Sequence, residues 1–541
     1  MTVTEILRKV ILKAVGLSKL DGRPNDDELT FINDVERLKR TRIKEYNIWY
    51  EGDGDELLNF YTNQNMFEYH YEPFYLRNKK NYFWAISSTE TDIKRSHSGI
   101  PRSIVDTMVG ITRFPVIRVG RQQLGEKNEA NEVLQAIIAK TKLKSKYKQK
   151  QMPLTMVEGW GCWKINWNSN VSKYPRLMYY RADSVDFVYA NDEIIGVIFK
   201  DWYTDGDKRL MLTETRRIVG SSLVIESELF ETNKADSEYV NKISIESCGI
   251  PALRNVKPRI EIENFPYLFA EPCIFFEDTS KNGGHGRSIF QGKIDLFDDL
   301  DQCISQDSNS VRRSTVIEYF NTDFLERDTE TGLPKQPKAY DRKYTMYSGQ
   351  KDANGASTSN DPVQVTQPAV NFEQYSTEAI NIITRIIHGI MSPATLGIDL
   401  AKRDNAEAQR EKEKVTIFTR NGIIDSETEI LHSLCTQLLC AYEFINTDKI
   451  TLKEYDISIK FSEFADDSYE NKLKTLSEAY NAEAISDEMY MSKLYGDTLS
   501  DKEYETELAW LKKNHTEPRT QGMTGMAGGG HNIPGMFDEE L

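Results

Sequence analysis

Neighbouring acidic residues are the first feature of this sequence that could do chemistry. Asp53 and Asp55 form one such group, and Asp298 and Asp299 form another. Paired carboxylates can hold a divalent ion through their oxygens. Solvated surface carboxylates are the commoner explanation of such pairs, so we predict no metal site.

Phosphate-binding and hydrolytic motifs are the next candidates. The stretch from Gly283 to Ser288, with the sequence GGHGRS, lacks the lysine and the glycine spacing of a P-loop. We expect it to be a flexible lead-in to a helix. The sequence has no HExxH and no GxSxG motif, and its seven histidines stand apart. These observations predict no catalytic residue, no cofactor and no enzyme, although catalytic groups can converge from distant positions.

Composition limits the class of protein further. The chain has 541 residues, 39% of them hydrophobic, which is enough for two or more packed regions. Six scattered cysteines without a CxxC pair favour buried thiols in a reducing cytoplasm. The net charge of −16 argues against a protein that grips DNA tightly, because phosphate contacts need positive charge. We expect neither a membrane-spanning helix nor a signal peptide.

The elements that must position any site begin with helices and continue with a sheet. Helical spacing of apolar residues predicts helices over 27–49, 100–114 and 128–143. Alternating apolar residues between about 159 and 280 predict an antiparallel sheet region. The expected strands are 162–167, 177–181, 185–189, 194–202, 209–214 and 223–230.

A row of lysines lies between the third helix and this sheet. Lysine occupies every second position from Lys140 to Lys150. A strand would place these lysines on one face, whereas a helix would spread them around its axis. They are either a solvated surface or a contact for a polyanion or an acidic subunit.

The second half of the chain is mainly helical. Helices are expected over 290–311 and 371–391, separated by a turn-rich segment, 313–370, with short strands near 316–320 and 343–347. A loop over 394–409 precedes a long helix from about Ala406 to Tyr442. We expect this helix to be interrupted or kinked at Asn421-Gly422 and to restart at a capping box, Ser426-x-x-Glu429. A strand over 455–461, a helical module over 466–513 and a disordered glycine-rich tail follow.

Three short stretches stand at the start of the first of these helices, in the loop and in the terminal module: Gly286-Arg287-Ser288 with IDLFDDLD at 294–301, IMSPATLG at 390–397 with Asn405-Ala406-Glu407-Ala408, and YNAEAIS at 480–486 with Glu503 and Glu507. With the order of the elements, they resemble the siphovirus-type portal proteins, or head-to-tail connectors, of tailed bacteriophages. The resemblance covers most of residues 27–513.

The resemblance implies an α+β portal fold with a mixed helical and antiparallel-sheet wing, a two-helix stem, a small α/β clip, a long wing helix and a helical crown. The chain divides accordingly into an N-terminal arm (1–26), the wing (27–285 and 410–465), two stem helices (286–312 and 371–391), the clip (313–370), the tunnel loop (392–409), the crown (466–513) and the tail (514–541).

Function and partners also follow from the resemblance. The family forms rings, expected here to be dodecamers, at the unique capsid vertex of the virion, after synthesis in the host bacterial cytoplasm. The ring is the channel for packaging and ejection of double-stranded DNA. Expected partners are other copies of this chain, the terminase large subunit, a head-completion or neck adaptor, and the major capsid and scaffold proteins, with no membrane.

The same resemblance points to residues that would face the DNA. The tunnel loop would ring the duplex at its narrowest point. Lys402 and Arg403 are expected to touch phosphates transiently, or else to pair with Asp399 or Asp404. Arg312 and Arg313, at the junction of stem and clip, are weaker DNA-facing candidates. The loop candidates are Ala394, Thr395, Leu396, Gly397, Lys402, Arg403, Asp404 and Asn405.

Two other classes of protein remain open at this point. Another virion structural protein, such as a tail or baseplate component without a DNA channel, would share the acidic charge and the lack of motifs. A packaging enzyme is the less favoured alternative, because the chain lacks phosphate-binding and metal-binding motifs.

Overall fold

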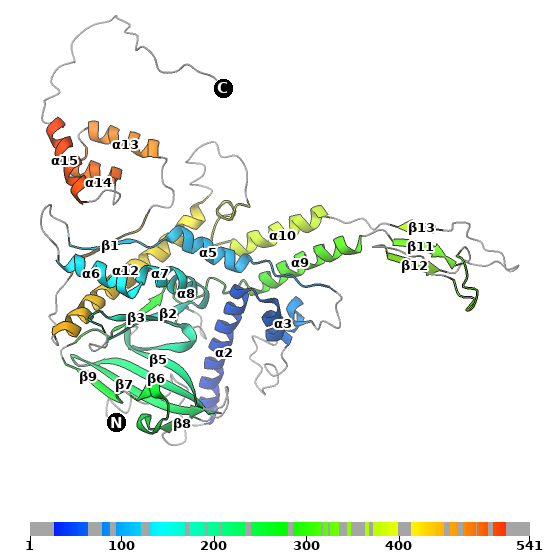
Figure 1. Ribbon diagram of the computed structural model, residues 1–541, viewed down its shortest axis with the longest axis horizontal. Helices are drawn as coiled ribbons and strands as arrows, with labels where there is room; N and C mark the ends of the chain where they lie inside the picture. Colours follow the sequence, from blue (N-terminus) through cyan, green and yellow to red (C-terminus); the bar gives the residue numbers. More distant parts are fainter. Residues whose placement is uncertain are drawn as a thin grey trace, which may run out of the picture. The chain divides into compact units, whose positions relative to one another are not determined.

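The structure is a computed structural model (Figure 1), in which the chain forms two compact units, Met1–Ser462 and Glu463–Leu541. The expected N-terminal arm up to residue 25, Lys402 to Asn405 and the tail from residue 516 lie outside the described residues. The structure describes residues 26–62, 78–86, 93–120, 129–167, 172–190, 193–205, 208–232, 240–254, 256–263, 265–279, 285–314, 317–322, 325–334, 343–347, 363–366, 372–398, 413–447, 455–462, 469–482, 484–495 and 501–515.

Helices form the first part of unit 1, and the expected helices are confirmed. Their apolar faces are buried: in α5, for example, Ile104, Val105 and Met108 are almost fully inaccessible to solvent. A short helix after Gly52 was not predicted from the sequence. The helices are α2 (Asp26–Glu51), α3 (Gly54–Thr62), α5 (Ile100–Thr112), α6 (Glu129–Thr141), α7 (Leu143–Lys146), the π-helix η5 (Tyr147–Gln151) and α8 (Met152–Glu158), with 3-10 turns η3 (Asn78–Asn81) and η4 (Phe83–Ala85).

Antiparallel sheets follow, so the α+β fold class is confirmed. Six strands pair in the order β4-β5-β6-β7-β8, with β9 also on β7, and a second sheet has the order β10-β2-β3. The first sheet consists of β4 (Val185–Ala190), β5 (Glu193–Asp205), β6 (Lys208–Val219), β7 (Ser222–Thr232), β8 (Val240–Ile243) and β9 (Arg259–Ile262); the second consists of β2 (Trp160–Asn166), β3 (Arg176–Arg181) and β10 (Ala270–Ile274).

The glycine-rich segment 283–288 was expected to be a flexible lead-in to a helix, but its described part makes a close backbone contact. Residues 280–284 lie outside the described residues, but Gly286 lies against Gly159, at the end of α8. A Cβ atom added to Gly286 would stand 2.2 Å from the carbonyl oxygen of Gly159. Only glycine fits at this position, so Gly286 is a packing residue rather than part of a phosphate loop.

The long helix α12 (Lys414–Thr447) crosses unit 1 and contacts β10, β2, α5 and α6. The helix is continuous through Asn421-Gly422, so the predicted interruption and the restart at Ser426 are wrong. Ser426 Oγ donates to the carbonyl oxygens of Phe275 and Gly422 instead of capping a new helix. Because Thr416 and Arg420 are buried before Asn421-Gly422, and Ile423 and Leu431 are buried after it, tertiary packing overrides the weak local helix propensity.

Two helices and a small sheet lie between β10 and α12 in the sequence. Helix α9 (Ile294–Arg313) packs against α10 (Phe372–Ile387), and the turn η10 (Pro393–Leu396) follows α10. The chain between the helices forms β11 (Ile317–Asn321), β12 (Lys343–Tyr347) and β13 (Val363–Thr366), with β11 parallel to β12 and antiparallel to β13. The first two strands match the predicted ones, and the third was not predicted.

A short strand and a group of helices follow α12 in the described part of the chain. The expected strand near 455–461 is β14 (Ile457–Lys460), which pairs with β1 (Val116–Val119). Unit 2 contains α13 (Tyr469–Asn481), α14 (Asp487–Tyr495) and α15 (Asp501–His515), so the helical nature of 466–513 is confirmed where the chain is described. Among the helices that the structure describes, none is long and apolar enough to cross a membrane.

Candidate functional site

The first half of α9 is anchored in the core of unit 1. Its apolar stripe buries Phe297 and Leu300 completely and Ile294 almost completely. The Phe297 ring lies 5.6 Å from Trp49 and 5.3 Å from Phe290, measured between ring centroids. Such aromatic contacts bury large areas and fix the helix in position.

Acidic side chains on another face of the same helix hold an earlier segment of the chain. We call residues 82–86 and 93–98 the strap. The carboxylate of Asp298 accepts hydrogen bonds from the backbone N–H groups of Phe83 (2.7 Å) and Trp84 (3.2 Å). Tyr82 OH donates to Asp295. These bonds explain why the acidic residues of α9 follow helical spacing.

Asp301 is the most heavily bonded of these acids. It is fully buried and accepts from Trp84 Nε1 (3.0 Å), His97 Nδ1 (2.8 Å) and the Ser98 backbone N–H (2.8 Å). One turn further, Ser305 Oγ accepts from the Ser96 backbone N–H at 2.9 Å. A buried carboxylate with three donors is satisfied, and the strap is fixed along one face of α9.

One member of each acidic pair singled out from the sequence therefore has a structural role, and the expectation of a solvated surface carboxylate is wrong for Asp298, which is buried. Burial raises the pKa of Asp298 to about 7, while the two backbone N–H donors counteract this shift. Asp53 Oδ1 accepts from the backbone N–H groups of Asp55 and Glu56 and so caps α3. Among the described residues, no group of three or more metal-binding side chains comes together.

Helix α10 is attached to α9 at both ends. Near the far end of α9, Tyr375 OH accepts from Ser310 Oγ (3.3 Å), and Cys303 Sγ lies 3.7 Å from the carbonyl oxygen of Tyr375. Near the base, Lys293 Nζ donates to the carbonyl oxygens of Arg385 and His388, both at 3.1 Å. A lysine at this position satisfies the last carbonyls of α10 and complements its helix dipole.

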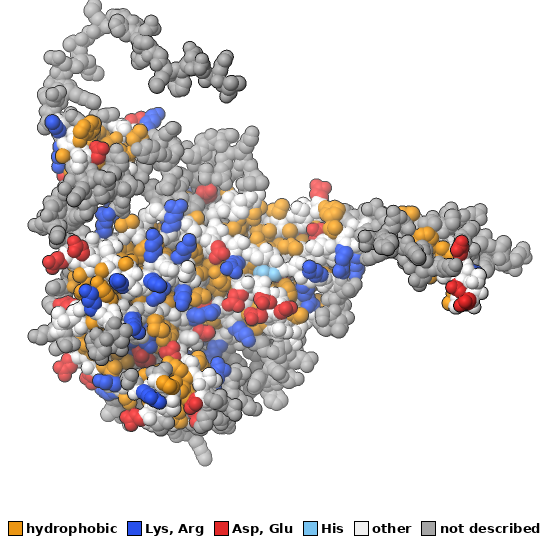
Figure 2. Space-filling model, viewed as in Figure 1, with side chains coloured by type: hydrophobic (Ala, Val, Ile, Leu, Met, Phe, Trp, Pro, Cys, Tyr) orange, Lys and Arg blue, Asp and Glu red, His pale blue; other side chains and the backbone are white. Residues whose placement is uncertain are grey.

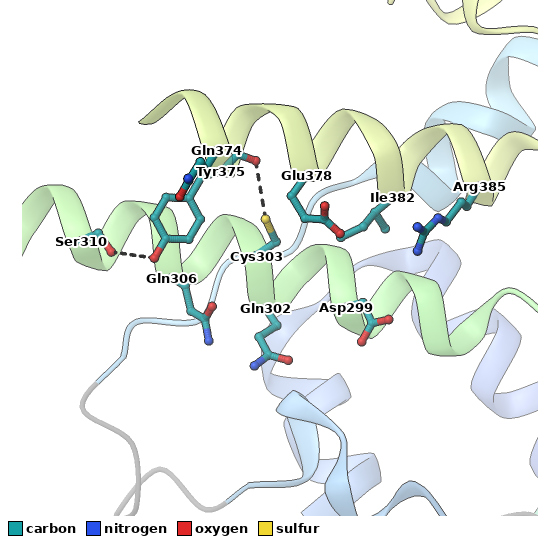
Figure 3. Close-up of a pocket in the computed structure, with 10 residues that line it drawn as sticks. All are labelled: Asp299, Gln302, Cys303, Gln306, Ser310, Gln374, Tyr375, Glu378, Ile382 and Arg385. Carbon is teal, nitrogen blue, oxygen red and sulfur yellow. Dashed lines mark hydrogen bonds between the residues drawn. The ribbon is translucent and has the colours of Figure 1, made fainter. Parts of the chain in front are cut away.

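A pocket of about 560 Å³ lies between the two helices (Figure 3). Figure 3 shows Tyr375 reaching from α10 to Ser310, with Arg385 and Asp299 at the other end of the pocket. Most of the lining residues carry a polar or charged group, although their apolar parts contribute about as much of the surface. The lining consists of Asp299, Gln302, Cys303, Gln306, Ser310, Gln374, Tyr375, Glu378, Ile382 and Arg385.

The chemistry of this pocket fits binding better than catalysis. Cys303 is its one thiol, and burial raises the pKa of that thiol, so the reactive thiolate is disfavoured. No histidine stands among the ten lining residues to act as its base. Burial and the neighbouring Asp295 raise the pKa of Asp299, whereas Arg385 lowers it. The amide and charged groups can hydrogen-bond a partner laid along the helix pair.

The outer surfaces of the helix pair are exposed and partly apolar. Phe372 is 54% exposed, Ile380 is 47% exposed and Val311 is 44% exposed. Arg312 and Arg313 are exposed in the last turn of α9, where positive charge complements the helix dipole. Arg312 also donates to Asn309 Oδ1 at 3.1 Å, so helix capping accounts for these arginines as well as DNA contact does.

The first half of the predicted tunnel loop is folded. Ala394, Thr395 and Leu396 belong to the 3-10 turn η10, and Ala394 is buried. Thr395 Oγ1 lies 2.7 Å from Thr416 Oγ1, which ties the turn to the start of α12. Gly397 closes the turn with a φ of +74°, a conformation that favours glycine.

The remaining four loop candidates lie outside the described residues: Lys402, Arg403, Asp404 and Asn405. The structure therefore brings Ala394 to Gly397 together with α12, and it places Arg312 and Arg313 at the opposite end of α9 from the anchored base.

The sequence interpretation missed the strap and Lys293. One signal was present, because Asp295, Asp298, Asp301 and Ser305 repeat at intervals of three or four and so share one helical face. Their partners lie more than 200 residues earlier in the chain, which local spacing does not reveal.

No protein-family model matches the sequence, and no curated protein matches it either.

Proposed function

We propose that this chain is the subunit of a bacteriophage portal, a ring through which double-stranded DNA is packaged and ejected. The proposal takes α9 and α10 as the stem, the β11–β13 segment as the clip, the sheets and α12 as the wing, and unit 2 as the crown. It rests on the order of these parts and on the resemblance of three short stretches of sequence.

The observation that carries the proposal is the construction of the α9–α10 pair. Its base is locked into the core by Phe297 and Asp301, whereas Phe372 and Ile380 leave apolar surface exposed farther along. Apolar area of this kind gains free energy when a partner covers it. A ring supplies such a partner, because each copy offers two different surfaces to its two neighbours.

The polar pocket between α9 and α10 supports the same interpretation. Its glutamines and charged groups would pair with polar groups of an adjacent subunit. The terminase large subunit and later a neck adaptor are proposed to dock on the clip, and the major capsid and scaffold proteins on the wing.

Electron microscopy of the purified full-length protein, with its particle mass measured in parallel, tests the proposal. The expected result is rings with a central channel and a mass near twelve or thirteen subunits. A stable monomer or dimer under all conditions would reject the channel. Filaments or flat, spoke-like assemblies would favour another virion structural protein, and Mg²⁺-dependent ATPase or nuclease activity would favour a packaging enzyme.

A further inference from the structure

The row of lysines singled out in the sequence forms an exposed ridge that the proposed portal function does not use. The row is helical rather than extended. It begins at the end of α6, continues through α7 and ends in the π-helix η5. We call its five exposed lysines the lysine ridge: Lys140, Lys142, Lys144, Lys148 and Lys150.

The fold turns these side chains outward for a specific reason. Leu143, Tyr147 and Gln151 recur every four residues and form a buried stripe. Lys144 and Lys148 lie on one flank of this stripe and Lys150 on the other, and all three are exposed. The sixth lysine, Lys146, differs, because its Nζ donates to the carbonyl oxygen of Leu177 at 2.6 Å. In Figure 2, Lys and Arg side chains gather over the region where Figure 1 labels α6 and α7.

The positive charge of the ridge is not neutralised by the described part of the chain. Residues 140–157 contain six lysines and no acidic residue. The ion pairs of buried lysines among the described residues lie elsewhere, as between Lys164 and Glu214. Burial lowers the pKa of Lys146, and the positive charges of Lys150 and Lys142 lower it further. Like charges one helical turn apart destabilise a helix, and an anion laid across them would remove that cost.

We propose that the lysine ridge binds the phosphate backbone of double-stranded DNA without regard to sequence. Lysine is a hydrated point charge suited to phosphate, whereas protein interfaces are depleted of it. The ridge carries no arginine and no exposed aromatic ring, so it lacks the groups that read base edges or stack on single strands.

The dimensions of the ridge agree with this ligand. Lys142 has a φ of +56° and separates α6 from α7, so the helical rise is counted from Lys142 to Lys150, which is about 12 Å at about 1.5 Å per residue. That length covers about four phosphates of one DNA strand at about 3.4 Å each. The whole chain carries a net charge of −16, so we expect attraction of phosphate to be confined to the ridge. This attraction falls off within a screening length of about 8 Å at physiological salt.

The test is DNA binding by the full-length protein in a series of salt concentrations. The probe is a fluorescent 40-base-pair duplex of random sequence, read by anisotropy. One variant replaces the five ridge lysines by Gln. A control variant removes the same charge from exposed lysines elsewhere: Lys94→Gln, Lys173→Gln, Lys257→Gln, Lys474→Gln and Lys493→Gln.

We expect the ridge variant to lose at least tenfold in affinity at 0.1 M salt. Its plot of log affinity against log salt should be shallower by about four, since each phosphate contact contributes about 0.9 to the slope. The control should lose no more than about twofold. Lys144→Glu with Lys148→Glu is a second variant with fewer changes, and it should show a smaller loss in the same direction.

Several outcomes would overturn the proposal. They are no DNA binding by the natural protein at 50 mM salt, equal losses in the ridge variant and the control, or unchanged DNA binding when the ridge is neutralised. Normal DNA binding with lost self-association would assign the ridge to an acidic subunit instead. The inference does not depend on ring formation, because a monomer that binds DNA through the ridge would support it while rejecting the portal.

Discussion

The two halves of α9 are built in opposite ways. In the first half, Phe297 and Leu300 are buried on one face, and Asp298 and Asp301 hold the strap on another. In the last turn, Val311 and Arg312 are exposed, and hydrogen bonds link this end of the helix to Tyr375 of α10 and Arg312 to Asn309. Among the described residues, the base is enclosed by its partners, whereas the tip keeps apolar surface exposed. Folding therefore fixes the base, and under the proposed function a neighbouring subunit would cover the tip.

Removing the Asp301 carboxylate should have the largest effect. Asp301→Ala leaves Trp84 Nε1, His97 Nδ1 and the Ser98 N–H without their acceptor. We expect a loss of about 3 kcal/mol or more in the free energy of unfolding, measured from the denaturation midpoint by tryptophan fluorescence. Asp299→Ala, on the exposed side of the same helix, should stay within about 0.5 kcal/mol. Equal effects of the two changes would show that the strap does not anchor the base.

Two phenylalanines separate folding from assembly. Phe297→Ala should cost about 3 kcal/mol, because it opens a cavity between Trp49 and Phe290. Phe372→Ala removes a ring that is 54% exposed, so the stability of the monomer should change by less than about 0.5 kcal/mol.

The same pair of variants tests the ring when particle mass is measured. Phe372→Ala should shift the protein from rings to smaller species at a given concentration, with its denaturation midpoint unchanged. Unaltered rings in Phe372→Ala would remove the exposed face of α10 from the subunit interface.

The raised pKa of Asp298 gives the stability of the α9 base a pH dependence. Burial raises the folded-state pKa to about 7 from 3.8, so the folded protein keeps a proton that the unfolded chain releases. The stabilising contribution is complete below about pH 4 and is lost as the pH rises through 7. We expect a decline of about 1–2 kcal/mol between pH 5 and pH 7.

Glu271 and Glu427 have raised pKa values of about 8, so they also make stability decline as the pH rises. Asp298→Asn removes the contribution of Asp298 alone and so separates it from theirs. The variant should be less stable at pH 5 and should show a shallower decline in thermal melting temperature toward pH 7. A decline as steep as that of the natural protein would assign the pH dependence to other groups.

The same contrast explains how much the sequence could predict. Helical spacing alone predicts the buried face of α9, which consists of Ile294, Phe297 and Leu300. Alternating apolar residues predict the strands β2 to β7. The predicted interruption at Gly422 was wrong because the free energy gained by burying Ile423 and Leu431 in the same helix exceeds the cost of glycine's weak helix propensity. The contact between the strap and α9 could not be predicted, because Asp301 and Trp84 are 217 residues apart and local spacing does not reveal such contacts.

The smallest expected effect concerns two basic side chains at the ends of α9, Lys293 just before the helix and Arg312 in its last turn. Lys293 Nζ donates to two carbonyl oxygens at the end of α10, so Lys293→Met should cost about 1 kcal/mol in stability. Arg312 is exposed and donates a hydrogen bond to Asn309 Oδ1 within its own turn, so Arg312→Met should stay within about 0.5 kcal/mol. Methionine keeps much of the apolar stem in both cases, and denaturation midpoints measure the difference. If Arg312→Met were the costlier change in the monomer, the tip of α9 would be anchored by folding after all, and its exposed surface would no longer argue for a neighbouring subunit.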